Sequence, residues 1–498
     1  MRYFNTEGRC RPEEHYMVPL DDRLDKIKRL YVDRKKYFVI NRGRQYGKTT
    51  TLMALEEYLK NDYMVLFMDF QMISSTDFAD EQTFTVKFAE YIEKLFSKRE
   101  QKDGIDLQAL EELASLKEKQ NISMDMLFAR LSRNCETCEK PIVLMIDEVD
   151  SASYNQVFID FLSQLRGYYL NRENNLIFHS VILAGVYDVK NLKLKLRDDR
   201  EYQYNSPWNI AADFDIDMSF SARQIASMLR EYEADYHMGM DVGAAGNHIY
   251  QYTSGYPYLV SAICKIMDEK LPDKEAFADR KAIWTAKGID EAVKILMDRQ
   301  IPLFGSMMRH ISEYPDLKKL LYAMLFLGEQ AAYNPDNETI ELAHMFGYVK
   351  NSAMGVQVAN RIFEMRLYNL FLSEEELSSA MSRAAKQDRN QFVAGGRLFL
   401  LYLKPIINGV GNYYIDAQTR DARRTDVIVD YGGEQFVIEM KLWHGNEYHQ
   451  RGKRQLAECL DYYHQEKGYL LSFNFNKKKK TGVQEIPIDG KTIIEAVV

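Results

Sequence analysis

One short stretch near the start of the chain restricts the fold more than any other. Tyr37–Asn41 (YFVIN) has the composition of a buried strand, residues 50–60 have the pattern of a helix, and Gly47-Lys48-Thr49 lies between them. A glycine-lysine-threonine turn in this context is typical of a phosphate-binding loop, or P-loop. In such a loop backbone amides surround a phosphate, the lysine reaches its oxygens and the hydroxyl holds Mg²⁺.

The predicted loop departs from the general P-loop pattern at one position. That pattern begins with glycine at position 42, whereas this chain has Arg42 followed by Gly43. Because the strand and the helix are both in place, and a helix N-terminus carries partial positive charge, we expect the loop to bind a nucleoside triphosphate, ATP together with Mg²⁺. The residues expected to contact the nucleotide here are Arg44, Gln45, Tyr46, Gly47, Lys48, Thr49 and Thr50.

A second apolar run, residues 141–148, ends in two carboxylates. It reads PIVLMIDE and predicts a buried strand followed by Asp147 and Glu148. Asp147 would bind the nucleotide through Mg²⁺ beside Thr49, and Glu148 would act in catalysis by polarising the attacking water. The alternative is a buried strand that ends in two solvated acids. The position of the run downstream of the predicted P-loop, with one predicted strand between them, favours the Mg²⁺ site.

The apolar patterns predict an α/β multidomain protein. A chain of 498 residues is too long for one core. Strand-like and helical runs alternate over the first part, which is the pattern of a P-loop parallel sheet. The expected domains are a P-loop ATPase-like domain (1–220), a helical lid (221–300), a winged-helix-like module (301–375) and a C-terminal α/β domain (376–498).

Charge is divided unevenly along the chain. The net formal charge is −8, yet residues 381–498 carry 18 Lys and Arg against 14 Asp and Glu. A chain that is acidic overall does not coat nucleic acid as a whole. The basic C-terminal part is therefore the part suited to contact phosphate backbones.

The sequence also indicates a compartment. It has no basic-then-apolar signal and no run of about 18 apolar residues, so we expect a cytoplasmic protein without a membrane span. Its five cysteines are scattered, as in a reducing compartment. Cys135 and Cys138 form a CxxC pair without a second pair, so two incidental cysteines are favoured over a zinc or redox site.

The C-terminal part carries its own candidate site. Asp426 lies near the start of one predicted strand, and Glu439 and Lys441, two residues apart on the next strand, share a face. In a hairpin Asp426 and Glu439 would bind Mg²⁺ while Lys441 positions water, and Gln455 of the following helix would complete the catalytic set. These residues suit hydrolysis of a phosphodiester. By spacing alone, a half-buried hairpin with charges on its solvent face is an equal alternative.

Several segments together resemble a known family. The chain is similar to bacterial proteins that fuse an AAA-ATPase-like domain to a nuclease domain of the PD-(D/E)XK superfamily, and its ATPase half is similar to archaeal-type ATPases of the STAND group. The resemblance covers nearly the whole chain and includes the Arg42 variant of the loop. Its segments are YFVINRGRQYGKTTTL, PIVLMIDEVD, SPWNIAADF, SGYPYLV, RRTDVIVDYGGEQFVIEMK and RQLAECLDYY.

The resemblance implies more than the motifs do. It implies a restriction-endonuclease-like α/β fold for residues 376–498. It also leads to the hypothesis that an ATPase controls a Mg²⁺-dependent nuclease. This nuclease would act on nucleic acid, with DNA favoured, in defence or DNA processing. The rival hypothesis is a non-catalytic ATP-dependent switch whose nuclease fold binds nucleic acid or protein. A motor on DNA is a third alternative. Whether the protein forms a homo-oligomer is left open. The site residues implied are Lys48, Thr49, Asp147, Glu148, Asp426, Glu439 and Lys441.

Overall fold

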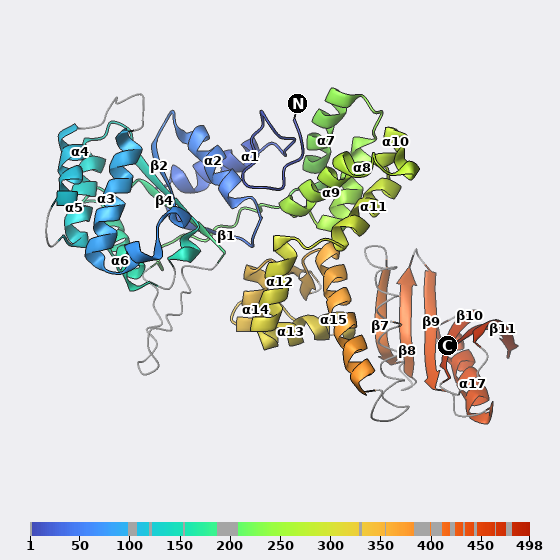
Figure 1. The fold of residues 1–498 in the computed structure, drawn as a ribbon. Helices are drawn as coiled ribbons and strands as arrows, with labels where there is room; N and C mark the ends of the chain where they lie inside the picture. Colours follow the sequence, from blue (N-terminus) through green and yellow to red (C-terminus); the bar gives the residue numbers. More distant parts are fainter. Residues whose placement is uncertain are drawn as a thin grey trace, which may run out of the picture. The chain divides into compact units, whose positions relative to one another are not determined.

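The computed structural model describes residues 2–97, 107–118, 122–152, 155–186, 208–327, 331–353, 355–382, 399, 411–418, 424–431, 434–442, 446–463, 465–474 and 481–498. The chain divides into two units. The first comprises Met1–Arg299 and Ala343–Gly347, and the second comprises Gln300–Leu342 and Tyr348–Val498. Figure 1 shows the helices and strands of both units.

The first unit is built around a parallel sheet with the strand order β1-β4-β3-β2. Beyond β1, Ala212 forms a parallel bridge with Phe38, so residues near 212 run along the outer edge of that strand. Because parallel strands all end at the same edge, the residues that follow β1 and β3 meet there. The strands are β1 (Tyr37–Asn41), β2 (Met64–Asp69), β3 (Ile142–Asp147) and β4 (Ser180–Gly185).

Helices cover both faces of this sheet (Figure 1), as its nearly continuous apolar strands require. Alternate strand residues enter two separate cores: Val39 and Leu144 face α3, α5 and α6, whereas Phe38 and Val143 face α1 and α2. The predicted α/β fold with a parallel sheet is confirmed here. The helices are α1 (Asp21–Ile27), α2 (Lys48–Leu59), α3 (Glu81–Ser97), α4 (Leu107–Ala114), α5 (Met124–Thr137) and α6 (Gln156–Leu170).

A helical group follows the sheet in the first unit. It begins with a capping box, in which the Ser221 hydroxyl accepts from the Gln224 N–H and the Gln224 side chain accepts from the Ser221 N–H. Near the N-terminus, Phe4 packs against Tyr232 and Trp284 of this group. The helices are α7 (Ala222–Tyr236), α8 (Val242–Thr253), α9 (Pro257–Glu269), α10 (Arg280–Ile283) and α11 (Ala286–Met297).

The second unit opens with helices and a small hairpin. His310 and Tyr348 link its first helix to the hairpin through a hydrogen bond of 2.9 Å between Nδ1 and the hydroxyl oxygen. The winged-helix-like module expected at residues 301–375 stays a prediction. The elements in this region are α12 (Pro302–Glu313), α13 (Pro315–Tyr322), α14 (Glu338–Met345), β5 (Val349–Ser352), β6 (Gly355–Val358) and α15 (Arg361–Ser382).

A mixed sheet in the order β11-β12-β10-β9-β8-β7 forms the described C-terminal part, and α17 (Asn446–Tyr462) packs on it. The pairs β7–β8, β8–β9 and β11–β12 are antiparallel, whereas β9–β10 and β10–β12 are parallel. The strands are β7 (Gly411–Gln418), β8 (Arg424–Tyr431), β9 (Glu434–Leu442), β10 (Lys467–Phe473), β11 (Gly482–Ile488) and β12 (Lys491–Val497).

The strand pattern of the sequence missed β11 and β12. β11 is mostly exposed and contains Pro487, so it lacks the alternation that marks a half-buried strand. The sequence also predicts a helix around Arg397–Leu403, a stretch that lies outside the described residues except for Phe399.

The described residues include no helix that is long and apolar enough to cross a bilayer. The five cysteines all lie in the described part of the chain, and none of them forms a disulfide. Cys135 lies in the core of the first unit, where burial raises the pKa of its thiol, and Cys138 is partly buried beside it. A protonated, buried thiol is a poor metal ligand or nucleophile, so these contacts favour the incidental pair.

Candidate functional site

The predicted P-loop connects β1 to α2 and encloses a buried lysine. Gln45 and Gly47 have left-handed φ angles of 56° and 79°, which curl the loop around the start of α2. The Lys48 ammonium is buried and donates hydrogen bonds to the carbonyl oxygens of Arg42 (2.9 Å) and Gly43 (3.1 Å). A lysine held by neutral carbonyls can exchange them for phosphate oxygens, which attract it more strongly.

Three carboxylates at or just after the end of β3 act on this lysine: Asp147 is buried, and Glu148 and Asp150 are partly buried. Burial lowers the pKa of Lys48, and the negative charges of Asp150, Glu148 and Asp147 oppose that lowering. Burial raises the pKa of Asp147, while hydrogen bonds from the Thr49 hydroxyl and the Glu148 N–H favour its charged form. The site therefore holds its lysine and its acids in a water-poor environment where charges act strongly on one another.

Thr49 and Asp147 are joined directly. The Thr49 hydroxyl donates to Asp147 Oδ2 at 2.6 Å, and Asp147 Oδ1 accepts from the Glu148 N–H at 2.9 Å. Asp147 is 1% exposed. The structure thus brings together the two oxygen ligands that the sequence assigned to Mg²⁺, although they come from the ends of different elements.

Glu148 follows Asp147 in a left-handed backbone conformation, with φ 51° and ψ 41°. A residue other than glycine is unfavourable in this conformation, by about 1–2 kcal/mol. Burial raises the pKa of its half-buried carboxyl group, with Asp147 and Asp150 adding to the effect and Lys48 opposing it. A carboxyl group of this kind suits the handling of a water proton.

The Arg42 side chain lies along the chain that leads into the helical group. Its guanidinium donates to the carbonyl oxygens of Asn41 (2.9 Å), Phe214 (3.1 Å) and Ile216 (3.0 Å), and it stacks 5.4 Å from the Phe214 ring centroid. A glycine at position 42 could make none of these contacts. The departure from the general loop pattern therefore has a structural explanation, which the sequence did not reveal.

Gly43 is enclosed by residues far away in the sequence. A Cβ atom at this position would lie 2.7 Å from the carbonyl oxygen of Phe346, which belongs to the same unit. The Tyr256 hydroxyl donates to the Arg44 carbonyl, and its ring meets Tyr46 edge-on with 4.6 Å between centroids. The loop is therefore braced by the start of α9 and by the short segment Ala343–Gly347.

The other predicted loop residues differ in their surroundings. Arg44 is exposed, whereas Gln45 and Thr50 are partly buried. The Thr50 hydroxyl accepts from the Cys10 N–H at 3.2 Å, so it is already engaged. Gln45 Oε1 is buried without a hydrogen-bond partner. The oxygen and the nitrogen of an amide group have nearly the same size and shape. A half-turn of the Gln45 amide would therefore put its NH₂ group in the place of Oε1, where it can donate to an anion.

Two acids near this site were missed by the sequence analysis. Asp69 ends β2 and pairs in register with Asp147 across the parallel strands. Asp150 lies in the 3₁₀ turn η5 (Val149–Ser151) after β3, and its Oδ2 accepts from the Val186 N–H at 2.6 Å. The position of both acids, at or just after the end of an apolar strand, could be seen in the sequence. No local pattern, however, shows toward which neighbours such a side chain points.

The C-terminal candidate site is described in part. Glu439 is 2% exposed, and its Oε1 lies 2.7 Å from the Lys441 ammonium. Val427 pairs with Ile438, so the register of β8 and β9 places Asp426 opposite Glu439 when it is continued by one residue. The side chains of Asp426 and Gln455 lie outside the described residues. A Cβ atom on Gly452 of α17 would lie 3.4 Å from Lys441 Cγ, so this helix covers the lysine.

The metal-binding capacity of the two sites differs. In the described part of the chain, no three His, Cys, Asp or Glu side chains group closely enough to hold a metal ion by themselves. Thr49 and Asp147 offer two adjacent oxygens, which fits Mg²⁺, an ion that protein sites bind through few side chains with water and phosphate completing its shell. At the C-terminal site, two acids are predicted to bind the metal, and of these only the side chain of Glu439 belongs to the described part of the structure.

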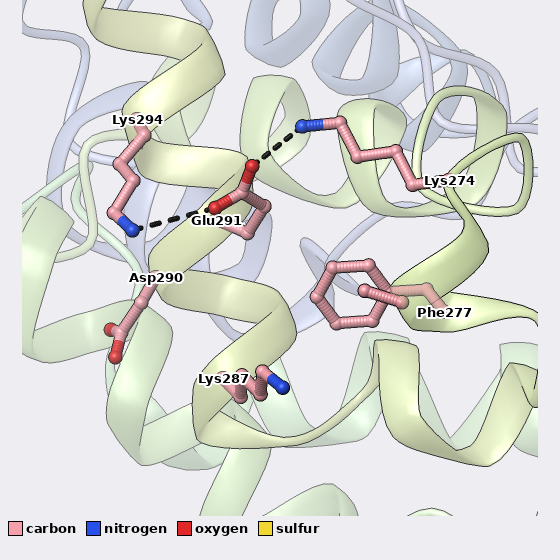
Figure 2. A pocket seen from close by; sticks show the side chains of 7 residues that line it. Lys274, Phe277, Lys287, Asp290, Glu291 and Lys294 are labelled. Atoms are coloured by element: carbon pink, nitrogen blue, oxygen red, sulfur yellow. Dashed lines mark hydrogen bonds and ion pairs between the residues drawn. The ribbon is translucent and has the colours of Figure 1, made fainter.

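A cavity of about 410 Å³ lies in the helical group and not at the P-loop. Figure 2 shows Glu291 between Lys274 and Lys294, with Asp290 and Lys287 on the same helix. Because Glu291 pairs with two of the lysines, the cavity carries little net charge, and the predicted site residues lie elsewhere.

Comparison with known proteins identifies the first unit. Residues 33–282 match the family model of the AAA-like domain. No curated protein matches the chain. Among solved structures, the Walker-type ATPase of Pyrococcus abyssi matches at 13% identity and a TM-score of 0.49, covering 73% of this chain and 99% of that one.

Two further solved structures match the chain more weakly. A mutant of Thermotoga maritima RuvB matches at 13% identity and a TM-score of 0.35, covering 68% of this chain and 92% of that one. The Aeropyrum pernix Orc2 protein in its ADP form matches at 14% identity and a TM-score of 0.38, covering 74% and 97%. The family match spans half of the chain, including the P-loop, β3 and four helices that follow the sheet, and the protein therefore belongs to the AAA-like domain family.

Proposed function

We propose that the protein binds ATP with Mg²⁺ at the P-loop and hydrolyses it. The observation that carries this proposal is the buried contact between Thr49 and Asp147, 2.6 Å, next to the enclosed Lys48. A lysine, a hydroxyl and a carboxylate at the carboxyl edge of a parallel sheet form the set that P-loop enzymes use. Membership of the AAA-like domain family supports the same function.

The residues take distinct roles in this proposal. Lys48 binds β- and γ-phosphate oxygens, and Thr49 and Asp147 hold Mg²⁺, which neutralises charge on the phosphates. Glu148 orients the attacking water and accepts its proton. The remaining nucleotide contacts come from the loop and the first turn of α2, through Arg44, Gln45, Tyr46, Gly47 and Thr50.

Glu148→Gln tests the assignment of the water-activating acid. The amide keeps the size of the side chain but cannot accept a proton, so this variant should bind ATP with nearly unchanged affinity and hydrolyse it at least about a hundredfold more slowly. Phosphate release and nucleotide binding are measured on the same preparation. Glu173→Gln, an exposed acid after α6, is the control and should match the unsubstituted protein.

A second function, hydrolysis of nucleic acid, is supported by the C-terminal site. The Glu439–Lys441 pair, 2.7 Å apart, and the strand register that sets Asp426 opposite Glu439 give the residue types of a PD-(D/E)XK centre. We propose that Asp426 and Glu439 bind Mg²⁺, that Lys441 and Gln455 orient water, and that the ATPase controls this activity on DNA. The rival proposal is a fold that binds nucleic acid or protein without cutting it.

A nuclease assay separates these two proposals. The full-length protein is incubated with Mg²⁺ or Mn²⁺, with and without ATP, and with single- and double-stranded DNA and RNA. Cleavage that disappears in Asp426→Asn and Glu439→Gln but persists in Glu485→Gln, an exposed acid of β11, supports the nuclease. Retention of DNA without cleavage in every condition supports the binding module. Light scattering with and without ATP tests whether the protein forms a homo-oligomer.

A further inference from the structure

A chain of contacts crosses the carboxyl edge of the first sheet and ends at the P-loop. Asp150, in the turn η5 after β3, accepts the Val186 N–H just beyond β4 at 2.6 Å. The carbonyl oxygen of the preceding residue, Gly185, accepts the Arg42 N–H at 3.2 Å. Two hydrogen bonds thus connect the turn that follows Asp147 to the first residue of the loop.

The same turn is also tied to β2. The Ser151 hydroxyl contacts the carbonyl oxygens of Glu148 at 2.9 Å and Phe70 at 3.3 Å. The turn η5 therefore connects the ends of β2, β3 and β4, and through Gly185 it reaches the loop after β1. Of these contacts, the one made by Asp150 is a short bond between a carboxylate and a backbone N–H, the kind that is strongest.

The contact made by Asp150 restricts which residue fits at position 185. A Cβ atom at residue 185 would lie 2.7 Å from Asp150 Oδ1 and 3.0 Å from a Val149 methyl group. Its φ angle is not left-handed, so any residue could adopt the backbone conformation. The Asp150 carboxylate and the Val149 methyl group are therefore what crowd a side chain at the end of β4, and the carboxylate is the closer of the two.

We propose that Asp150 is a positioning residue of the nucleotide site, which sets the spacing between the Asp147–Glu148 turn and the P-loop through the end of β4. This inference rests on the proposed ATPase function. Lys48 belongs to the loop, and Asp147 and Glu148 belong to the turn. Their mutual distances decide how well a phosphate is held and attacked, and small misplacements have large effects on rate.

Three variants of the full-length protein test the proposal. Asp150→Ala removes the acceptor, Asp150→Asn keeps an oxygen acceptor for the Val186 N–H, and Gly185→Ala forces a methyl group against an intact Asp150. We expect kcat for ATP hydrolysis to fall by about tenfold or more in Asp150→Ala and Gly185→Ala and to stay within about threefold in Asp150→Asn. The double variant Gly185→Ala/Asp150→Ala should lose less kcat than the two single losses combined, because the closer of the two clashes at residue 185, that with the carboxylate, is gone.

A second readout uses the protein without nucleotide. Hydrogen exchange is measured on a peptide that contains Arg42 and Gly43, together with the melting temperature. Faster exchange of this peptide in Asp150→Ala than in Asp150→Asn, at a temperature where both are folded, supports the proposal. Asp160→Asn, an exposed acid of α6 that pairs with Gln156, is the control and should leave exchange and kcat unchanged.

The outcomes distinguish a failure of the proposed ATPase function from a failure of the positioning role of Asp150. If the unsubstituted protein neither binds nor hydrolyses ATP, the proposed function fails, while the exchange experiment still tests the contact. If ATP is hydrolysed and Asp150→Ala matches the unsubstituted protein in kcat and exchange, the positioning role is wrong. It is also wrong if Asp150→Asn loses as much activity as Asp150→Ala, since charge and not the hydrogen bond would then be what matters.

Discussion

The hydroxyl of Thr49 donates a hydrogen bond of 2.6 Å to the Asp147 carboxylate, which is 1% exposed. This contact joins the first turn of α2 to the end of β3. It places two oxygens where Mg²⁺ would require them and holds an acid in a position that would otherwise disfavour its charge. The proposed nucleotide chemistry depends on this pair and on Lys48 beside it.

The pair predicts a pH dependence of Mg²⁺-dependent ATP binding. Burial raises the pKa of Asp147, so its carboxyl group stays protonated to a higher pH than an ordinary aspartate, and a protonated carboxyl group cannot hold Mg²⁺. Binding should therefore be lost on acidification at a pH above the usual range of aspartate. In Thr49→Val, which lacks the hydrogen bond that favours the charged form, the loss should occur at a still higher pH.

A fluorescent ATP analogue titrated at several pH values, with Mg²⁺ or with EDTA, measures this effect. Thr137→Val removes an exposed hydroxyl of α5 and serves as the control. An acid limb in the ordinary carboxyl range, unchanged by Thr49→Val, would show that Asp147 does not hold the ion.

Arg42→Gly is predicted to weaken the protein, even though it restores the general P-loop pattern. The substitution removes hydrogen bonds from a charged group to the carbonyl oxygens of Phe214 and Ile216 and should cost about 2 kcal/mol of unfolding free energy. Arg42→Lys should recover little, since an ammonium lacks the planar fork that reaches both carbonyls. Chemical denaturation measures the change, and an increase in stability would contradict this account of the loop.

Gly43→Ala is predicted to distort the loop. Its methyl group would lie 2.7 Å from the Phe346 carbonyl oxygen, which is backbone and cannot rotate away. Both the melting temperature and ATP affinity should fall. Gly167→Ala in α6 is a matched control, because nothing lies within 4 Å of its added Cβ, and alanine in a helix should stabilise by about 0.5–1 kcal/mol. Equal behaviour of the two variants would exclude the proposed contact.

A buried ion pair in the C-terminal sheet predicts strongly non-additive substitutions. Lys453 Nζ lies 2.8 Å from Glu495 Oε2, and Ser472 and Gln484 also donate to this carboxylate. Removing one partner leaves a buried charge, so Lys453→Met should cost about 3–5 kcal/mol. Lys453→Met/Glu495→Leu should cost less than Lys453→Met alone. Denaturant titrations of the single and double variants test this, and additive losses would contradict it.

The parts that the sequence predicted are those governed by local patterns. The strands β1 and β3 and the turn at Gly47-Lys48-Thr49 follow from apolar runs and from a loop whose chemistry demands particular residues. The pairing of β8 with β9 matches the hairpin expected from the two strand-like runs that carry Asp426 and Glu439. These features are contained in a few neighbouring residues.

The parts that were not predicted depend on residues distant in the sequence. Two of the carbonyl partners of Arg42, those of Phe214 and Ile216, lie more than 170 positions away, and Phe346, which encloses Gly43, lies still farther along the chain. Nothing near Asp150 indicates that it meets the end of β4. β11 was missed because most of it is exposed and, among the described strands, it pairs with β12 alone. Its residues therefore lack the alternation of apolar and polar side chains that would indicate a face packed on a core.

The central claim is that ATP is held at the P-loop by Lys48, and one equilibrium titration tests it most directly. ATP is titrated into the nucleotide-free, full-length protein with Mg²⁺, using the unsubstituted chain, Lys48→Ala, and Lys287→Ala in the cavity of the helical group as a matched lysine control. We predict saturable binding by the unsubstituted chain and the control, and at least about a hundredfold loss of affinity in Lys48→Ala. Equal affinity in all three proteins, or no binding to any of them, would contradict the account.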